Sequence, residues 1–136
     1  NRNVVESNMI GYVMVGTNDL DKAISFYDEI LKSINIKRVE TDPEYAAYAP
    51  IEKPTAIEFY VTKPFDKKKA TNGNGTQVSF VTDSRHMVDN FHKTGLKAGG
   101  KSEGSGGERP PNSGVYYSYI RDLDGNKICA FTNNKI

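Results

Sequence analysis

Several features that would assign this chain to a class directly are scarce or missing. It has one cysteine, Cys129, so no disulfide can form within the chain, and we expect a reducing, cytoplasmic location. No apolar run approaches the roughly 20 residues that span a bilayer, and no signal-peptide pattern opens the chain, so we expect no membrane partner. Lysine and arginine total 18 against 17 aspartate and glutamate, a net charge of +1. Because nucleic-acid binding needs an excess of positive charge, we expect no nucleic-acid partner.

Aromatic residues, by contrast, are plentiful. The 136 residues fit one compact domain or two very small modules that share a core. Hydrophobic residues make up 37% and charged residues 26%, which is polar for a globular protein. Eight tyrosines and six phenylalanines nevertheless supply bulky core material and argue against disorder. The composition therefore indicates a small soluble domain.

The first half of the chain predicts a strand, a helix and further strands. A strand over 10–15 leads into a helix that Thr17 or Asn18 is placed to cap. Apolar residues recur along this helix at the spacing of one face, namely Leu20, Ala23, Ile24, Tyr27, Ile30 and Leu31. Short strands are predicted over 46–49 and 56–61, with prolines between them.

A connector separates this half from a second, similar one. Residues 62–76 are rich in turn formers and contain the lysines 67–69, which we interpret as a solvated face rather than a phosphate site. A strand over 77–81 then precedes a helix over 85–97. The cap of this helix lies among Thr82, Asp83 and Ser84, and its inward stripe consists of Met87, Val88, Phe91 and Leu96.

The last third begins with a segment of unusual composition. Residues 101–114 (KSEGSGGERPPNSG) are rich in glycine and proline, and their length raises the hypothesis of a mobile lid or binding loop. Two strands are predicted over 115–121 and 127–132. Residues 122–126 join them and contain Asp-Gly, a strong turn signal.

The two halves align with each other. IGYVMVGTND (10–19) matches GTQVSFVTDS (75–84), and each strand runs into a capped helix. Further along, YAAYA (45–49) matches YSYI (117–120). The shared order is strand, helix and three strands. A repeat of this length indicates one module duplicated once rather than a solenoid.

The repeat sets the predicted domain organisation. We expect an α+β fold in which two βαβββ modules, 9–66 and 75–136, form a curved mixed sheet around a cleft within one domain. Residues 67–74 form the linker. Residues 1–8 are polar and aperiodic, and we interpret them as a disordered tail or a remnant added for expression.

Strand alternation predicts which side chains face the cleft. Successive side chains of a strand point to opposite faces, so one set packs under the helix and the other lines the open face. Aromatic and apolar walls with a few inward polar groups are typical of a small-molecule pocket. The predicted lining residues are Tyr12, Met14, Glu58, Tyr60, Gln77, Ser79, Tyr119, Cys129 and Phe131.

Three segments resemble a known family. They are MIGYVMVGTNDLDKAISFY (9–27), NGTQVSFVTDSRHMVDNFH (74–92) and VYYSYIRDLDGNKICAF (115–131). Together and in this order they resemble the vicinal oxygen chelate superfamily of glyoxalases, bleomycin-resistance proteins and extradiol dioxygenases, over nearly all of 9–132. The resemblance implies paired βαβββ modules around a metal-centred cleft, usually in a dimer.

The metal positions implied by this resemblance hold unusual residues. Glyoxalase-like members use two histidines and a glutamate, and these positions fall on Tyr12, Gln77 and Cys129. A further carboxylate position of the glyoxalases matches Glu58. Imidazole and carboxylate hold the usual divalent metals, and a tyrosine would have to ionise from a pKa near 10. We therefore expect no cofactor, with a divalent metal on this unusual set as the alternative.

The two histidines, the cysteine and a further carboxylate are the other candidates for catalysis. His86 and His92 lie six residues apart on the second helix, so we expect them on its surface and not in the cleft. Without a histidine nearby, Cys129 is interpreted as an inert core residue rather than a nucleophile. Glu58 interrupts an apolar strand, and we leave open whether it is a general base or simply reaches water.

Three functions remain as hypotheses. The first is a protein that binds a small hydrophobic or aromatic molecule in the cleft without metal. The second is an enzyme resembling lactoylglutathione lyase, or a related isomerase or dioxygenase, with Glu58 as the catalytic residue. The third, ranked last, is an interaction protein. Because the short modules leave open sheet edges, we expect a homodimer in each case.

Overall fold

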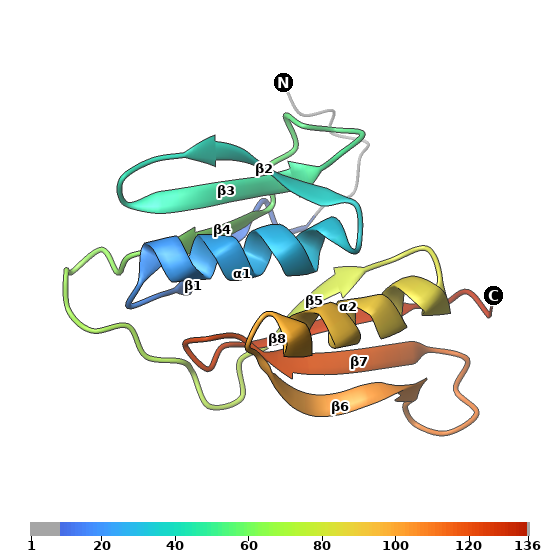
Figure 1. Ribbon diagram of the computed structural model, residues 1–136. Helices are drawn as coiled ribbons and strands as arrows, with labels where there is room; N and C mark the ends of the chain where they lie inside the picture. Colours follow the sequence, from blue (N-terminus) through green and yellow to red (C-terminus); the bar gives the residue numbers. More distant parts are fainter. Residues whose placement is uncertain (1–8, 136) are drawn as a thin grey trace.

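The computed structural model describes residues 9–135 and shows the same unit twice (Figure 1). The first module contains β1 (Val13–Gly16), α1 (Leu20–Lys32), β2 (Ile36–Thr41), β3 (Tyr45–Pro50) and β4 (Phe59–Thr62). The second contains β5 (Val78–Val81), α2 (Arg85–Lys97), β6 (Lys101–Glu108), β7 (Tyr116–Arg121) and β8 (Lys127–Thr132). The duplicated βαβββ order confirms the predicted α+β fold. The tail interpreted over 1–8 lies outside the described residues.

Each module forms one four-stranded mixed sheet. The strand orders are β1-β4-β3-β2 and β5-β8-β7-β6. In both sheets the first strand is parallel to the last, and the other pairs are antiparallel. Figure 1 shows one helix over one face of each sheet, with α1 and α2 side by side. Among the described residues, no helix covers the opposite face of either sheet.

The two helices begin where side chains cap them. Asp19 is the N-cap of α1, and its carboxylate accepts the N–H of Lys22 at 3.1 Å, so the prediction of Thr17 or Asn18 was wrong. Asn18 instead exchanges two hydrogen bonds with the backbone of Ala70, which ties the connector to the first module. In α2 the cap is Ser84, one of the three predicted residues.

The apolar stripes of the helices join both modules in one core. Tyr27 and Ile30 of α1 are fully buried in the same cluster as Phe91 of α2 and Ile120 of β7. Leu96 was predicted to face inward but is 43% exposed. Gly95 is the buried residue at that turn, and the side chains of Ile30 and Ile120 occupy the space that a Cβ atom would need there.

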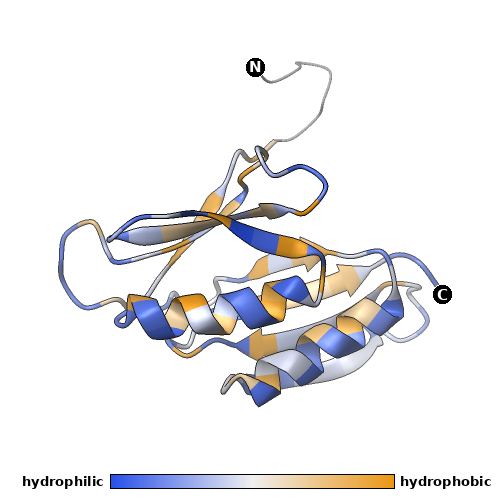
Figure 2. Ribbon diagram, turned by 45° about the horizontal axis from the view of Figure 1, so that its top comes forward, coloured by the Kyte–Doolittle hydropathy of each residue, from blue (hydrophilic) through white to orange (hydrophobic). Residues whose placement is uncertain are grey.

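Both helices are amphipathic, and Figure 2 shows hydrophilic and hydrophobic residues alternating along them. Apart from Leu96, their large apolar residues are buried or half-buried, and most of their charged residues are exposed. Among residues 9–135 no helix is long and apolar enough to cross a bilayer.

Two strands differ from the sequence-based expectation. The βαβββ order implies a strand between α1 and β3, but no residues were predicted for β2. β6 occupies most of the segment for which a lid was hypothesised, and it pairs with β7 over Lys101–Glu108 with two irregularities in register. Next to these, the Arg109 guanidinium donates hydrogen bonds to the carbonyls of Ser105, Gly107 and Tyr117. These contacts make most of the glycine-rich segment part of the sheet.

The turn between β7 and β8 fastens the second module to the first. The Asn126 side-chain amide donates to the carbonyl of Gly16 at 2.9 Å, and the N–H of Asn18 donates to the Asp124 carboxylate at 2.9 Å. Within the core, the Tyr27 hydroxyl donates to Asp122. The Asp-Leu-Asp-Gly-Asn sequence therefore makes a tight turn and also holds the two modules together.

Candidate functional site

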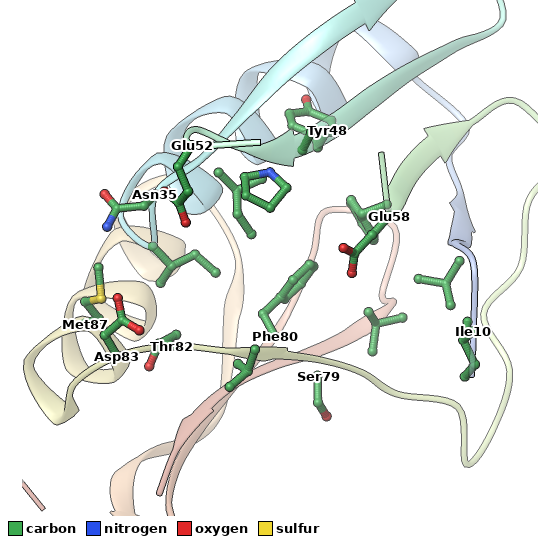
Figure 3. A pocket seen from close by; sticks show the side chains of 18 of the residues that line it. Ile10, Asn35, Tyr48, Glu52, Glu58, Ser79, Phe80, Thr82, Asp83 and Met87 are labelled. Carbon is green, nitrogen blue, oxygen red and sulfur yellow. The ribbon is translucent and has the colours of Figure 1, made fainter. Parts of the chain in front are cut away.

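A cavity of about 410 Å³ lies where the first module meets β5 (Figure 3). We call it the junction cavity. Its walls come from all four strands of the first sheet, from β5 and from the start of α2. They are mainly apolar and include Val13, Ile34, Ile36, Phe59, Val78 and Phe80. Its volume lies within the range of small-molecule sites.

Phe80 occupies the middle of the junction cavity in Figure 3. Strand alternation in β5 turns this ring toward the helices, but the neighbouring module leaves it half-buried. Its ring centre lies 5.2 Å from that of Phe59 and 6.2 Å from that of Phe91. Phe80 is not among the lining residues predicted from the sequence, because its place in the cavity depends on how the two modules meet.

Of the nine predicted lining residues, two reach the junction cavity. Glu58 immediately precedes β4. Its backbone carbonyl accepts a hydrogen bond from the N–H of Val13 at 3.0 Å, and its own N–H donates to the carbonyl of Tyr48 at 3.3 Å. Its side chain is exposed to water and points into the cavity in Figure 3. Ser79 borders the cavity on β5, but its side chain points away from Phe80 in Figure 3.

The remaining seven lie on the helix-free faces of the two sheets, in two separate groups. On the first sheet, Met14 and Tyr60 are register partners, and the Tyr12 ring packs edge-on against Tyr60 at 5.0 Å. On the second sheet, Cys129 lies between Ser79 and Tyr119 in the strand register, and Phe131 lies beside it on β8. Among residues 9–135 no aromatic contact joins the two groups.

The helix-free face of the second sheet carries a row of aromatic rings. Tyr117, which the sequence analysis left out, stacks on Tyr119 at 5.9 Å between ring centres and on Phe131 at 5.7 Å. Arg109 and Lys127 each approach the Tyr119 ring to 5.1 Å. The alternation in YYSY (116–119) already places residues 117 and 119 on one face, so this signal was available.

Comparison with known proteins assigns the chain to a family. The model of the Glyoxalase/Bleomycin resistance protein/Dioxygenase superfamily matches residues 9–130. The chain belongs to this superfamily. A glyoxalase/bleomycin resistance protein from Albidiferax ferrireducens T118 is similar in structure, with a TM-score of 0.82 and 36% identity over 92% of this chain and 98% of that one.

More distant members of the superfamily share the fold. A lactoylglutathione lyase from Agrobacterium tumefaciens has a TM-score of 0.65 and 19% identity over 93% of each chain. A glyoxalase-related enzyme from Fulvimarina pelagi has a TM-score of 0.70 and 17% identity over 92% of this chain and 88% of that one. The comparison with curated proteins finds no match.

Within one chain, the residues at the positions where the family resemblance implies metal ligands lie on two different sheets. Tyr12 lies on the first sheet, whereas the Gln77 amide donates to the Ser79 hydroxyl at 2.9 Å on the second. Cys129 is fully buried, and this burial raises the pKa of its thiol. A hydrogen bond with Ser79 acts to lower the pKa, but its effect is smaller. A neutral thiol is a poor ligand. In the part of the chain that the structure describes, no three His, Cys, Asp or Glu side chains are grouped to hold a metal. The donor set does not fit a divalent metal.

The two histidines lie outside the junction cavity. His86 is exposed on α2 and contacts Asn90. The Nε2 atom of His92 lies 2.7 Å from the Ser102 hydroxyl of β6, and burial lowers the pKa of this imidazole. Both side chains therefore serve the packing and surface of α2, as the sequence analysis interpreted them.

Proposed function

We propose that this protein binds a small hydrophobic or aromatic molecule without a metal, and that the junction cavity holds it. The observation that carries the proposal is an apolar cavity of ligand size with an aromatic ring, Phe80, half-exposed at its centre. An exposed ring in a cavity loses its contact with water when a ligand stacks on it, which stabilises the complex.

The lyase alternative has less support from the site. Proton abstraction beside a carbonyl creates an enediolate, which needs positive charge or strong donors close to its oxygens. Glu58 is the carboxylate in the junction cavity that matches the glyoxalase position, but no lysine or arginine is among the described residues that line this cavity. The side chains favour binding over this reaction.

We further propose a homodimer in which a second copy covers the helix-free faces. β1 and β5 are edge strands, each paired on one side only. Next to these edges, Tyr12 is 57% exposed, Met14 48% and Val81 72%. Exposed apolar side chains beside an unpaired strand edge favour association with another chain. A second copy would also bring together the two groups of predicted cleft residues.

The ligand proposal predicts saturable binding of a neutral apolar probe. We expect N-phenyl-1-naphthylamine to bind with one site per chain, read from the increase in its fluorescence. Phe80→Ala is expected to weaken this binding about tenfold, because it removes the central stacking surface. Tyr119→Ala, on the helix-free face, is the matched control and should leave the affinity unchanged. The opposite pattern would place the site on the aromatic row instead.

The proposal that the protein binds no metal predicts that divalent ions do not stabilise the folded state. An ion that bound the folded state at about 100 times its Kd would add about 2.7 kcal/mol to the free energy of unfolding. We expect Ni²⁺, Zn²⁺, Mn²⁺ and Fe²⁺ to leave the melting temperature of chelator-treated protein unchanged. A concentration-dependent rise that Glu58→Ala abolishes would restore the metal-enzyme hypothesis.

A further inference from the structure

The rim of the junction cavity carries charge of one sign. Glu52 from the loop after β3, Glu58 before β4 and Asp83 before α2 all line it, and no lysine or arginine does so among the described residues. The chain as a whole has nearly equal numbers of acidic and basic residues. The excess of negative charge is therefore a local property of the cavity.

The three carboxylates have no internal partner. Elsewhere in the protein, acidic residues such as Glu44 and Glu108 form ion pairs with lysine or arginine. Within residues 9–135, no ion pair or hydrogen bond involves the side chain of Glu52, Glu58 or Asp83. All three side chains are exposed at the rim, so a cation that enters the cavity meets negative charge and no positive charge among the described lining residues.

The aromatic and apolar side chains inside the cavity suit a cation that also has a hydrocarbon part. In Figure 3, Phe80 projects between Glu58 on one side and Glu52 and Asp83 on the other. The face of an aromatic ring attracts ammonium groups electrostatically. The apolar walls, with Phe59 behind Phe80, contribute only to a ligand that has hydrocarbon surface to bury.

We infer that the ligand of the junction cavity is an organic cation, with an ammonium group near the carboxylates and an aromatic or aliphatic body against Phe80. This inference rests on the proposed function, because it concerns the same cavity. An anion of the same size would face three carboxylates and no counter-charge. The rim therefore selects for positive charge and against negative charge.

Three probes of the same size and different charge test the inference. They are 1-naphthylmethylammonium, 1-naphthylmethanol and 1-naphthoate, measured by isothermal titration calorimetry on the full chain. We expect the cation to bind about tenfold more tightly than the neutral alcohol, and the anion more weakly than both. Raising the salt concentration from about 50 mM to about 500 mM should narrow these differences, because ions screen charges at the rim.

A double variant shows whether the rim is responsible. Glu58→Gln with Asp83→Asn should reduce the affinity for the cation about tenfold and leave that for the alcohol unchanged. The matched control is Asp21→Asn with Glu29→Gln, which removes the same charge from exposed positions on α1 outside the cavity. Circular dichroism of both variants checks that they are folded.

The outcomes distinguish a failure of the charge preference from a failure of ligand binding in the cavity. Equal affinity for the three probes would overturn the inference, while a loss of binding in Phe80→Ala would still support the cavity as a ligand site. A cation preference that survives in the Glu58/Asp83 variant, or that falls equally in the α1 control, would also overturn it. If none of the probes binds, the proposed function fails with it.

Discussion

Asp122→Ala is expected to lower the free energy of unfolding by about 3 kcal/mol, the largest effect of any single substitution considered. The Asp122 carboxylate is 6% exposed and accepts from the Tyr27 hydroxyl at 2.5 Å and from the backbone N–H groups of Asp124 and Asn126 at 2.9 and 2.8 Å. It also accepts from the Asn126 side chain at 2.9 Å. Alanine would leave the fully buried Tyr27 hydroxyl without an acceptor. Urea denaturation followed by circular dichroism measures the loss.

Tyr27→Phe is the matched control, since it removes one donor and keeps the carboxylate with its other partners. We expect a smaller loss of about 1–2 kcal/mol. Because Tyr27 and Asp122 satisfy each other, the double variant should lose less than the sum of the two single losses. Strict additivity would mean that the contact between the modules contributes nothing of its own.

Stability should also depend on pH through Asp122. Burial raises the pKa of its carboxyl above the ordinary aspartate value, although hydrogen bonds from Tyr27 and Asn126 act in the opposite direction. The folded state therefore binds this proton more tightly than the unfolded state does. The resulting stabilisation is fully present below the unfolded pKa, near 4, and is lost as the pH rises through the folded value.

Glu44 and Glu108 act in the opposite sense, because an ion pair and hydrogen bonds lower their pKa values. To isolate the effect of Asp122, we compare the free energy of unfolding of the wild type with that of Asp122→Asn. Glu44 and Glu108 are present in both proteins, so their contributions cancel in the difference. We expect this difference to shrink as the pH rises above the ordinary aspartate range. A difference that does not change with pH would contradict the raised pKa.

The helices could be predicted because their burial follows a simple period. Five of the six residues in the predicted stripe of α1 are buried, and Ile24 is half-buried. In α2 the same rule failed at Leu96, since it counts apolar residues and does not recognise that Gly95 allows close packing. Spacing identifies a face, but the neighbouring element decides which residue of that face fits.

The two strands that differ from expectation are edge strands. β2 (IKRVET) is interrupted by a register shift between Arg38 and Glu40, so its apolar residues do not alternate. An ion pair from Arg38 to Asp28 at 2.9 Å connects it to α1. β6 contains no large apolar residue, and its glycines give no strand signal. Pairing with β3 and β7 stabilises these strands, and pairing is not visible in their own sequences.

The candidate site was predictable in part. Alternation correctly placed Tyr12, Met14 and Tyr60 on one face of the first sheet. It could not predict how the modules are arranged. They pack through their helices and the β7–β8 turn, which separates the two helix-free faces within one chain and creates the junction cavity beside β5.

The close approach of the two helices leads to the second large prediction, which concerns Gly95. A Cβ atom at this position would lie 2.8 Å from Cδ1 of Ile30 in α1 and 3.0 Å from Cγ1 of Ile120 in β7. A leucine would extend further into this space and would have to push the modules apart. We expect Gly95→Leu to lower the free energy of unfolding by about 2–3 kcal/mol.

The sign of this effect distinguishes packing from helix propensity. Leucine is the better helix former by nearly 1 kcal/mol, so without tertiary contact the substitution would stabilise α2. Lys93→Leu, at an exposed position on the same helix, is the control and should change stability by less than about 0.5 kcal/mol. Urea denaturation compares both variants with the wild type. A stabilising Gly95→Leu would show that the helices need not touch at this turn, and the arrangement that forms the junction cavity would then lose one of its main supports.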